Sequence, residues 1–129
     1  GLEVFLLAWD FESDRSIYSQ IIEHFELSIL SGELLPGAKL DSVRELASQA
    51  SVNPNTMQRA LSELERIGLV YTQRTNGRFI TQDLSAIENA RNNFAKKHII
   101  DFLNRMQSLG LNKAQIIDLI EKYYEEDLQ

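Results

Sequence analysis

The chain has 129 residues, of which 43% are apolar and 25% charged, as in an ordinary globular protein. It has no cysteine, which excludes disulfides and thiolate metal sites and fits a cytoplasmic location. No apolar stretch approaches the roughly 20 residues that a membrane-spanning helix needs, so we expect no membrane contact. The net charge of −6 argues against a nucleic-acid partner unless the acidic residues lie away from the binding surface.

The charge is distributed unevenly along the chain. Residues 51–82 hold four arginines against two glutamates, a net charge of +2, whereas residues 1–50 hold three basic against nine acidic residues. An acidic body that carries a basic surface still binds DNA, with weak non-specific affinity as the consequence. Residues 51–82 are therefore the candidate for a nucleic-acid-binding surface.

Residues 17–30 predict a helix, because apolar side chains such as Ile21 and Phe25 recur at three- and four-residue spacing. Ser16 stands where an N-cap is expected, and Gly32 stands where a left-handed residue ends a helix. A turn through Pro36 then leads to the next element.

A second, short helix begins at Ser42, which forms a capping-box pattern with Glu45. After a turn, Asn53 and Pro54 predict the start of a third helix, because Asn accepts the free N–H groups and Pro loses no hydrogen bond there. Gly68 is expected to end it. The predicted buried stripe of this helix consists of Met57, Ala60, Leu61, Leu64 and Ile67.

The opposite face of the third helix is polar and contains Asn55, Thr56, Gln58, Arg59 and Ser62. Most helices of globular proteins have such a face in solvent, so on its own it is also compatible with an ordinary surface. In a helix-turn-helix unit, however, the second helix enters the major groove of DNA.

Two β-rich runs, residues 69–74 and 78–81, flank Asn76 and Gly77. Asn-Gly is the strongest short hairpin signal and predicts a type I′ turn. Arginines stand on both sides of this turn. Charged ends are also typical of a protected sheet edge, but directly after a helix-turn-helix they indicate a wing that approaches the minor groove or the backbone.

Ser85 and Glu88 predict a capping box at the start of a long helix that runs to about Leu109. Asn112 and Gln115 predict a second capping box, which starts the last helix. This last helix is expected to bury Ile116, Ile117, Ile120 and Tyr123 or Tyr124.

These two helices carry more apolar surface than a small winged domain covers, which indicates an oligomer interface. We expect a homodimer that is held by Phe94, Ile99, Phe102, Leu103, Met106, Ile116, Ile120 and Tyr123. The predicted fold is mainly α with a small β-wing, in which a winged helix-turn-helix domain at 12–82 precedes a helical hairpin for dimerisation at 83–129.

The sequence offers little support for an enzyme or a metal site. His24 and His98 are far apart and lie within apolar helical patterns. His98 and Asp101 are one helical turn apart and would supply half of a metal site, but no second pair of ligands is evident. We expect no catalytic residue, metal or cofactor.

Residues 17–80 resemble the DNA-binding domain of the GntR family of bacterial transcription regulators. The tail of only two helices and the run from Asn53 to Ala60 resemble the YtrA subfamily, whose members dimerise through the tail and lack a large effector domain. The motifs that carry the resemblance are IYSQI at 17–21, SGELLPG at 31–37, SVRELA at 42–47, VNPNT at 52–56 and QRAL at 58–61.

The resemblance implies a sequence-specific regulator, expected to be a repressor, that binds a palindromic double-stranded operator as a homodimer. It is also compatible with an unknown small-molecule effector. The implied DNA-binding residues are Ser42, Arg44, Asn53, Asn55, Thr56, Gln58 and Arg59 on the helices and Arg74 and Gly77 on the wing.

The sequence departs from the family pattern at three positions. Asp41 and Ser16 stand where the family usually has proline, and Thr75 stands where its wing usually has glycine. Asp41 would repel DNA phosphate, and Thr75 affects how closely the wing approaches the groove. These departures and the acidic balance leave an alternative open, in which the winged helix is a protein-interaction module without specific DNA binding.

Overall fold

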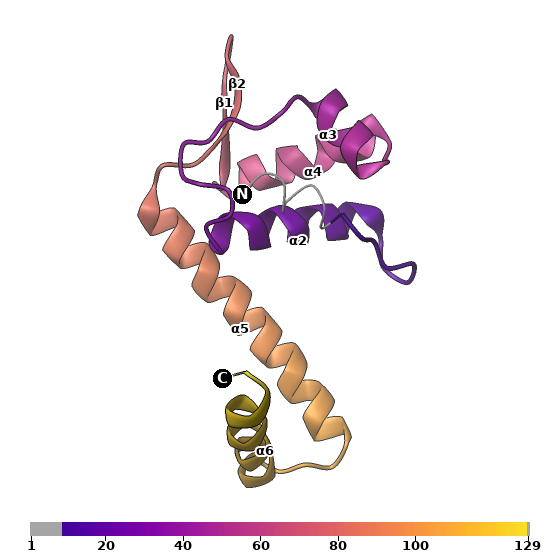
Figure 1. Ribbon diagram of the computed structural model, residues 1–129, viewed down its shortest axis with the longest axis vertical. Coiled ribbons are helices and arrows are strands. Elements are labelled where there is room, and N and C mark those ends of the chain that lie inside the picture. The colour runs from indigo at the N-terminus through magenta and orange to yellow at the C-terminus, as the bar shows by residue number, and fades with distance from the viewer. Residues whose placement is uncertain (1–8, 129) are drawn as a thin grey trace. The chain divides into compact units, whose positions relative to one another are not determined.

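The computed structural model describes residues 9–128 (Figure 1). A compact first unit ends at Arg91, and a second unit begins at Asn92. The first unit contains α2 (Ile17–Leu30), α3 (Val43–Ala50), α4 (Pro54–Arg66), β1 (Val70–Gln73) and β2 (Gly77–Ile80). Helix α5 (Leu84–Ser108) runs from the first unit into the second, where α6 (Lys113–Asp127) follows it. The predicted class, mainly α with a small β-wing and C-terminal helices, is confirmed.

The core of the first unit forms around α4, which packs against α2, α3 and β1, and Figure 1 shows α2 alongside α4. Ile21 and Phe25 of α2 are fully buried, as are Met57 and Leu61 of α4. The apolar stripe of each helix therefore faces the other helices, and this burial supplies most of the driving force for folding. The prediction that Ile67 belongs to the buried stripe of α4 is wrong, because Ile67 is the C-cap of the helix and remains 39% exposed.

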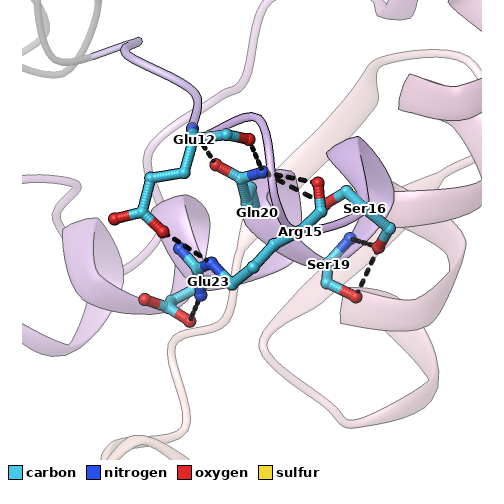
Figure 2. A network of polar contacts seen from close by, with 6 residues as sticks. All are labelled: Glu12, Arg15, Ser16, Ser19, Gln20 and Glu23. Atoms are coloured by element: carbon cyan, nitrogen blue, oxygen red, sulfur yellow. Dashed lines mark hydrogen bonds and ion pairs between the residues drawn. The ribbon is translucent and has the colours of Figure 1, made fainter.

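The start of α2 is fixed by a polar network that Figure 2 shows in close-up. The Ser16 hydroxyl caps the helix by accepting a hydrogen bond from the backbone N–H of Ser19, as predicted. The buried side chain of Gln20 donates to the Glu12 and Arg15 carbonyls at 2.7 and 2.9 Å and accepts from the Glu12 N–H at 2.6 Å. These bonds satisfy the buried amide and hold the preceding segment on α2.

The wing is an antiparallel pair in which Val70 lies opposite Ile80 and Gln73 opposite Gly77. The predicted type I′ turn at Asn76 and Gly77 is wrong. Instead, the Asn76 N–H donates to the Gln73 carbonyl at 3.1 Å, and Gly77 is already the first residue of β2, with φ +102°. A β-turn over 73–76 followed by a glycine with positive φ therefore reverses the chain.

The start of α5 differs from the predicted Ser85–Glu88 capping box. The Asp83 carboxylate accepts hydrogen bonds from the backbone N–H groups of Ser85 and Ala86, at 3.0 and 3.2 Å. Asp83 therefore caps the helix, and Glu88 forms an ion pair with Arg91 instead. The helix therefore begins two residues earlier than predicted, and the Asp83 carboxylate both satisfies free N–H groups of its first turn and favours the positive end of the helix dipole.

The second unit contains the remainder of α5 and the whole of α6, which folds back to form a helical hairpin (Figure 1). The predicted capping box of Asn112 and Gln115 is confirmed. Within residues 92–128 of the single chain, Ile116 alone is buried. The prediction that α6 also buries Ile117, Ile120 and Tyr123 or Tyr124 is therefore wrong for one isolated chain, because all four are at least 42% exposed.

Between residues 9 and 128, no helix is both long and apolar enough to cross a membrane.

Candidate nucleic-acid interface

The turn between α3 and α4 determines how the two helices of the candidate interface are oriented. Ser51 ends α3 with φ 55° and ψ 48°, a left-handed conformation that is uncommon for a residue other than glycine. Its N–H and that of Val52 donate to carbonyls of α3, which closes the helix and reverses the chain. Only three residues separate the end of α3 from the start of α4, as a helix-turn-helix requires.

The N-terminus of α4 presents polar side chains. Asn53 caps the helix, because its Oδ1 accepts a hydrogen bond from the Asn55 N–H at 2.7 Å. Pro54 occupies the first helical turn, Asn55 is exposed, and Thr56 is half-buried. The free N–H groups and the positive end of the helix dipole favour an anion such as a DNA phosphate at this end.

Arg59 lies one turn further along α4 and is exposed to solvent. Its guanidinium carbon lies 4.6 Å from the centroid of the Tyr18 ring of α2, a cation–π contact. The neighbouring Gln58 is also exposed, and its amide donates to the Ser62 hydroxyl at 3.3 Å. No pattern in the sequence pairs Tyr18 with Arg59.

The start of α3 contributes Ser42 and Arg44. The Ser42 hydroxyl accepts from the Glu45 N–H at 3.1 Å while the Glu45 carboxylate accepts from the Ser42 N–H at 3.3 Å. This capping box is the one predicted from the sequence. Arg44 is exposed in the first turn.

Asp41 precedes the capping box and is half-buried. Its carboxylate accepts a hydrogen bond from the Gln49 side chain at 3.1 Å. The residue thus bonds to a side chain of α3, whereas the cap of that helix is Ser42.

The wing and the start of α3 enclose a polar cleft of about 790 Å³. Arg74 and Gly77, which were predicted as wing contacts, both line it. Lys39 and Arg78 line it too, and no sequence motif pointed to Lys39. Three basic side chains therefore gather at the side of the wing that faces α3.

An ion pair lies near the C-terminal end of α4. Arg66 donates two hydrogen bonds to the Glu63 carboxylate, at 2.8 and 2.5 Å. The pKa of Glu63 is lowered, first by the hydrogen bond from Arg66 and further by the charge of Arg66, although partial desolvation opposes the shift.

In the second unit, five of the eight predicted dimerisation residues line one apolar groove of about 480 Å³. Phe94, Ile99 and Leu103 do not line it, and Ile99 is exposed on α5. The five that the groove brings together are Phe102, Met106, Ile116, Ile120 and Tyr123.

Metal ligands do not gather in the described part of the chain, where no group of three or more His, Cys, Asp or Glu side chains is placed to hold an ion. His98 instead lies over Phe94, with ring centroids 4.3 Å apart.

Comparison with known proteins identifies the matching family. The model of the gntR family of bacterial regulatory proteins matches residues 17–80. The HTH-type transcriptional regulator YhcF of Bacillus subtilis is 39% identical over 115 residues, which cover 89% of this chain and 95% of YhcF. The HTH-type transcriptional repressor YtrA of the same organism is 45% identical over 74 residues, 57% of each chain.

Solved structures agree with these relatives. A GntR family transcriptional regulator from Listeria monocytogenes has a TM-score of 0.81 and 41% identity, with 87% of this chain and 98% of that chain covered. The N-terminal domain of AraR in complex with a mutant ORR3 has a TM-score of 0.50 and 30% identity, covering 54% of this chain and all of that one. The chain, with its winged helix-turn-helix and two C-terminal helices, belongs to the gntR family of bacterial transcription regulators and is YtrA-like.

Proposed function

We propose that the protein is a sequence-specific repressor that binds a palindromic DNA operator as a homodimer. The observation that carries the proposal is the N-terminal end of α4, which follows the helix-turn-helix turn and leaves Asn55, Gln58 and Arg59 exposed. An α-helix presented in this way fits the major groove, where each base pair has a distinct pattern of donors and acceptors. The similar N-terminal domain of AraR has been solved in complex with a mutant ORR3, and this likeness supports the proposal.

The candidate side chains divide into two groups by their chemistry. Arginine pairs with guanine, and glutamine or asparagine pairs with adenine, so we assign base contacts to Arg44, Asn55, Gln58 and Arg59. We assign phosphate or wing contacts, which fix position without reading sequence, to the other group. This second group consists of Ser42, Asn53, Thr56, Arg74 and Gly77.

The homodimer is proposed from the exposed apolar surface of the second unit. Among the described residues, ten of the fifteen exposed large hydrophobic side chains lie beyond Asn92. Six of the ten line the apolar groove, where a second copy of the chain would cover them, and a two-fold dimer places two equivalent reading helices on symmetric half-sites. We therefore assign DNA binding to 12–82 and dimerisation to 83–129, the latter through the eight residues predicted from the sequence.

The repressor role is proposed because the related proteins YtrA and NagR are repressors by name. A regulator of this kind works on chromosomal DNA, so we place it in the cytoplasm. The apolar groove of about 480 Å³ also has the size of a small-molecule pocket, which supports an effector as a second occupant.

Selection of bound DNA from a random pool, with the full chain as bait, tests the proposal. We expect enrichment of an inverted repeat whose half-sites are about 10 base pairs apart, or a multiple of that spacing. Enrichment of a single, non-repeated site would contradict the homodimer. A pool that fails to converge at low salt would favour the protein-interaction alternative.

A further inference from the structure

The segment before α3 is joined to the wing by backbone hydrogen bonds. The Ile80 N–H donates to the Ala38 carbonyl at 2.8 Å, and the Leu40 N–H donates to the Arg78 carbonyl at 2.9 Å. Lys39 and Phe79 form an antiparallel bridge between them. Residues 38–40 therefore run beside β2 like a short additional strand.

This pairing determines where the Lys39 side chain points. Successive side chains of an extended segment point to opposite faces, and Leu40 is buried, with only 6% of its surface exposed. Lys39 must then lie on the opposite face, and it is exposed. The segment cannot slip by one residue without burying the ammonium group and exposing Leu40.

Gly77 makes room for the Lys39 side chain. A Cβ atom placed on Gly77 would lie 3.3 Å from Cε of Lys39, which is tighter than nine in ten real Cβ contacts. The aliphatic part of Lys39 therefore lies against the bare backbone at the start of β2. The φ of +102° at Gly77 independently favours glycine at this position.

The charges around Lys39 favour an anionic ligand. Its ammonium group shares the cleft with Arg74 and Arg78. The two acids that line the same cleft, Asp41 and Glu45, accept hydrogen bonds from neutral donors and keep their charge, so three basic against two acidic side chains leave the cleft with a net charge of +1. No salt bridge joins Lys39 to a carboxylate within residues 9–128, and the buried Nε of Arg78 has no acceptor there.

We infer that Lys39 binds a phosphate of the DNA backbone beside the wing, a role that rests on the function proposed above. Lysine supplies a point charge on a flexible stem without the planar fork that reads a base, so the contact adds affinity but no sequence preference. Gly77 then contributes indirectly, because its missing side chain lets the Lys39 stem lie along β2.

The salt dependence of DNA binding tests this inference. Fluorescence anisotropy with the full chain and its selected operator gives the slope of log K against log salt concentration. Each phosphate contact that is lost should reduce this slope by about 0.9, so Lys39→Gln should reduce it by about 1.8 in a dimer. The loss of affinity should be equal for the operator and for a scrambled duplex.

Three controls make the result decisive. Lys96→Gln changes the same charge at an exposed position of the second unit and should leave the slope unchanged. Lys39→Arg keeps the charge and should keep the wild-type slope. Thermal unfolding of all variants should match the wild type, because the altered side chains are exposed.

The possible outcomes separate the inference from the proposed function. A wild-type slope for Lys39→Gln, or a loss restricted to the operator, would overturn the phosphate contact while leaving the regulator intact. A wild-type chain that binds no DNA at low salt would overturn the proposed function itself. Competition by inorganic phosphate beyond that of chloride at equal ionic strength would assign the site to a free anion instead.

Discussion

The two units of the chain use similar amphipathic helices with opposite results. In the first unit, the apolar residues of α2, α3 and α4 face one another, and side chains such as Phe25 and Leu61 have no exposed surface. In the second unit, Ile116 is the single buried residue of the described range 92–128. The aromatic and branched side chains around it remain open to solvent, as Ile120 and Tyr123 illustrate.

This contrast indicates which part of the molecule can fold without a partner chain. A helix that buries its apolar face within its own unit gains the hydrophobic free energy in the monomer. A helix that leaves the face open gains it only when a partner covers that face, so its stability depends on concentration. The first unit should therefore fold alone, and the second should require association.

Truncation after Arg91 should give the largest effect on DNA binding. The cut should fall after Arg91 because Ile87 is buried and the Arg91 guanidinium donates to the Leu30 carbonyl at the end of α2, at 3.1 Å. The product should be a folded monomer whose operator affinity is lower by about 10²- to 10⁴-fold, because the second half-site no longer binds in the same complex.

Analytical ultracentrifugation and anisotropy would measure both properties. A truncated chain that remains dimeric would show that the interface lies in the first unit. A truncated chain that unfolds would show that the first unit depends on the second.

A matched pair of alanine variants compares the two units directly. Leu61→Ala removes a side chain with no exposed surface and should cost about 2–5 kcal/mol in free energy of unfolding at any protein concentration. Ile120→Ala removes one that is 46% exposed in the single chain, so it should mainly weaken the dimer. Denaturant titrations at several protein concentrations measure both effects.

An unchanged dimer dissociation constant for Ile120→Ala would show that the apolar groove is not the interface.

The helix starts were the most predictable features of the fold. Ser16, Asn53 and the Ser42–Glu45 pair satisfy free N–H groups within four residues of sequence, so local sequence determines them. Asp83 shows the limit of this reasoning. Both Asp83 and Ser85 are residue types that cap helices well. Which of them is the cap depends on the residue at which the chain leaves the wing and begins α5.

Contacts between distant segments were not predictable from the sequence. Lys39 pairs with Phe79, and Tyr18 lies against Arg59, across about 40 residues in each case. Neither contact corresponds to a periodicity or a motif spacing in the sequence, because both contacts depend on how α2, α4 and the wing pack. The exposure of Ile67 has the same origin, since only packing decides whether the last residue of a stripe is covered.

A substitution of Arg59 tests whether the surface that contacts DNA bases lies in the first unit. Arg59→Ala should weaken operator binding by about 1–3 kcal/mol and change the base preference at one position of each half-site. Arg105→Ala makes the same change on α5, at an exposed position of the second unit, and should leave both properties unchanged. Equal losses for the two variants would indicate a general charge effect.

Tyr18 should have a smaller effect on DNA binding, through the position of Arg59. Tyr18→Leu removes the ring beneath the guanidinium and should weaken operator binding by about 0.5–1 kcal/mol, the usual strength of an exposed cation–π contact. Tyr18→Phe keeps the ring and should bind as the wild type does. The loss should vanish in an Arg59→Ala background, and a loss that persists there would show that Tyr18 acts through packing alone.

The Glu63–Arg66 pair should have the smallest effect and tests whether surface charges add to the stability that burial gives the first unit. The folded pKa of Glu63 lies below its ordinary value of 4.5, so the pair stabilises the fold above that pH and loses its effect as pH falls through the folded pKa. Glu63→Gln should therefore lower the Tm slightly at pH 7 and leave it unchanged near pH 2. Glu65→Gln, an exposed neighbour in no salt bridge of residues 9–128, is the matched control. Equal Tm shifts for Glu63→Gln at both pH values would show that the carboxylate charge does not contribute to stability, because protonation of Glu63 near pH 2 would then have removed no stabilising interaction.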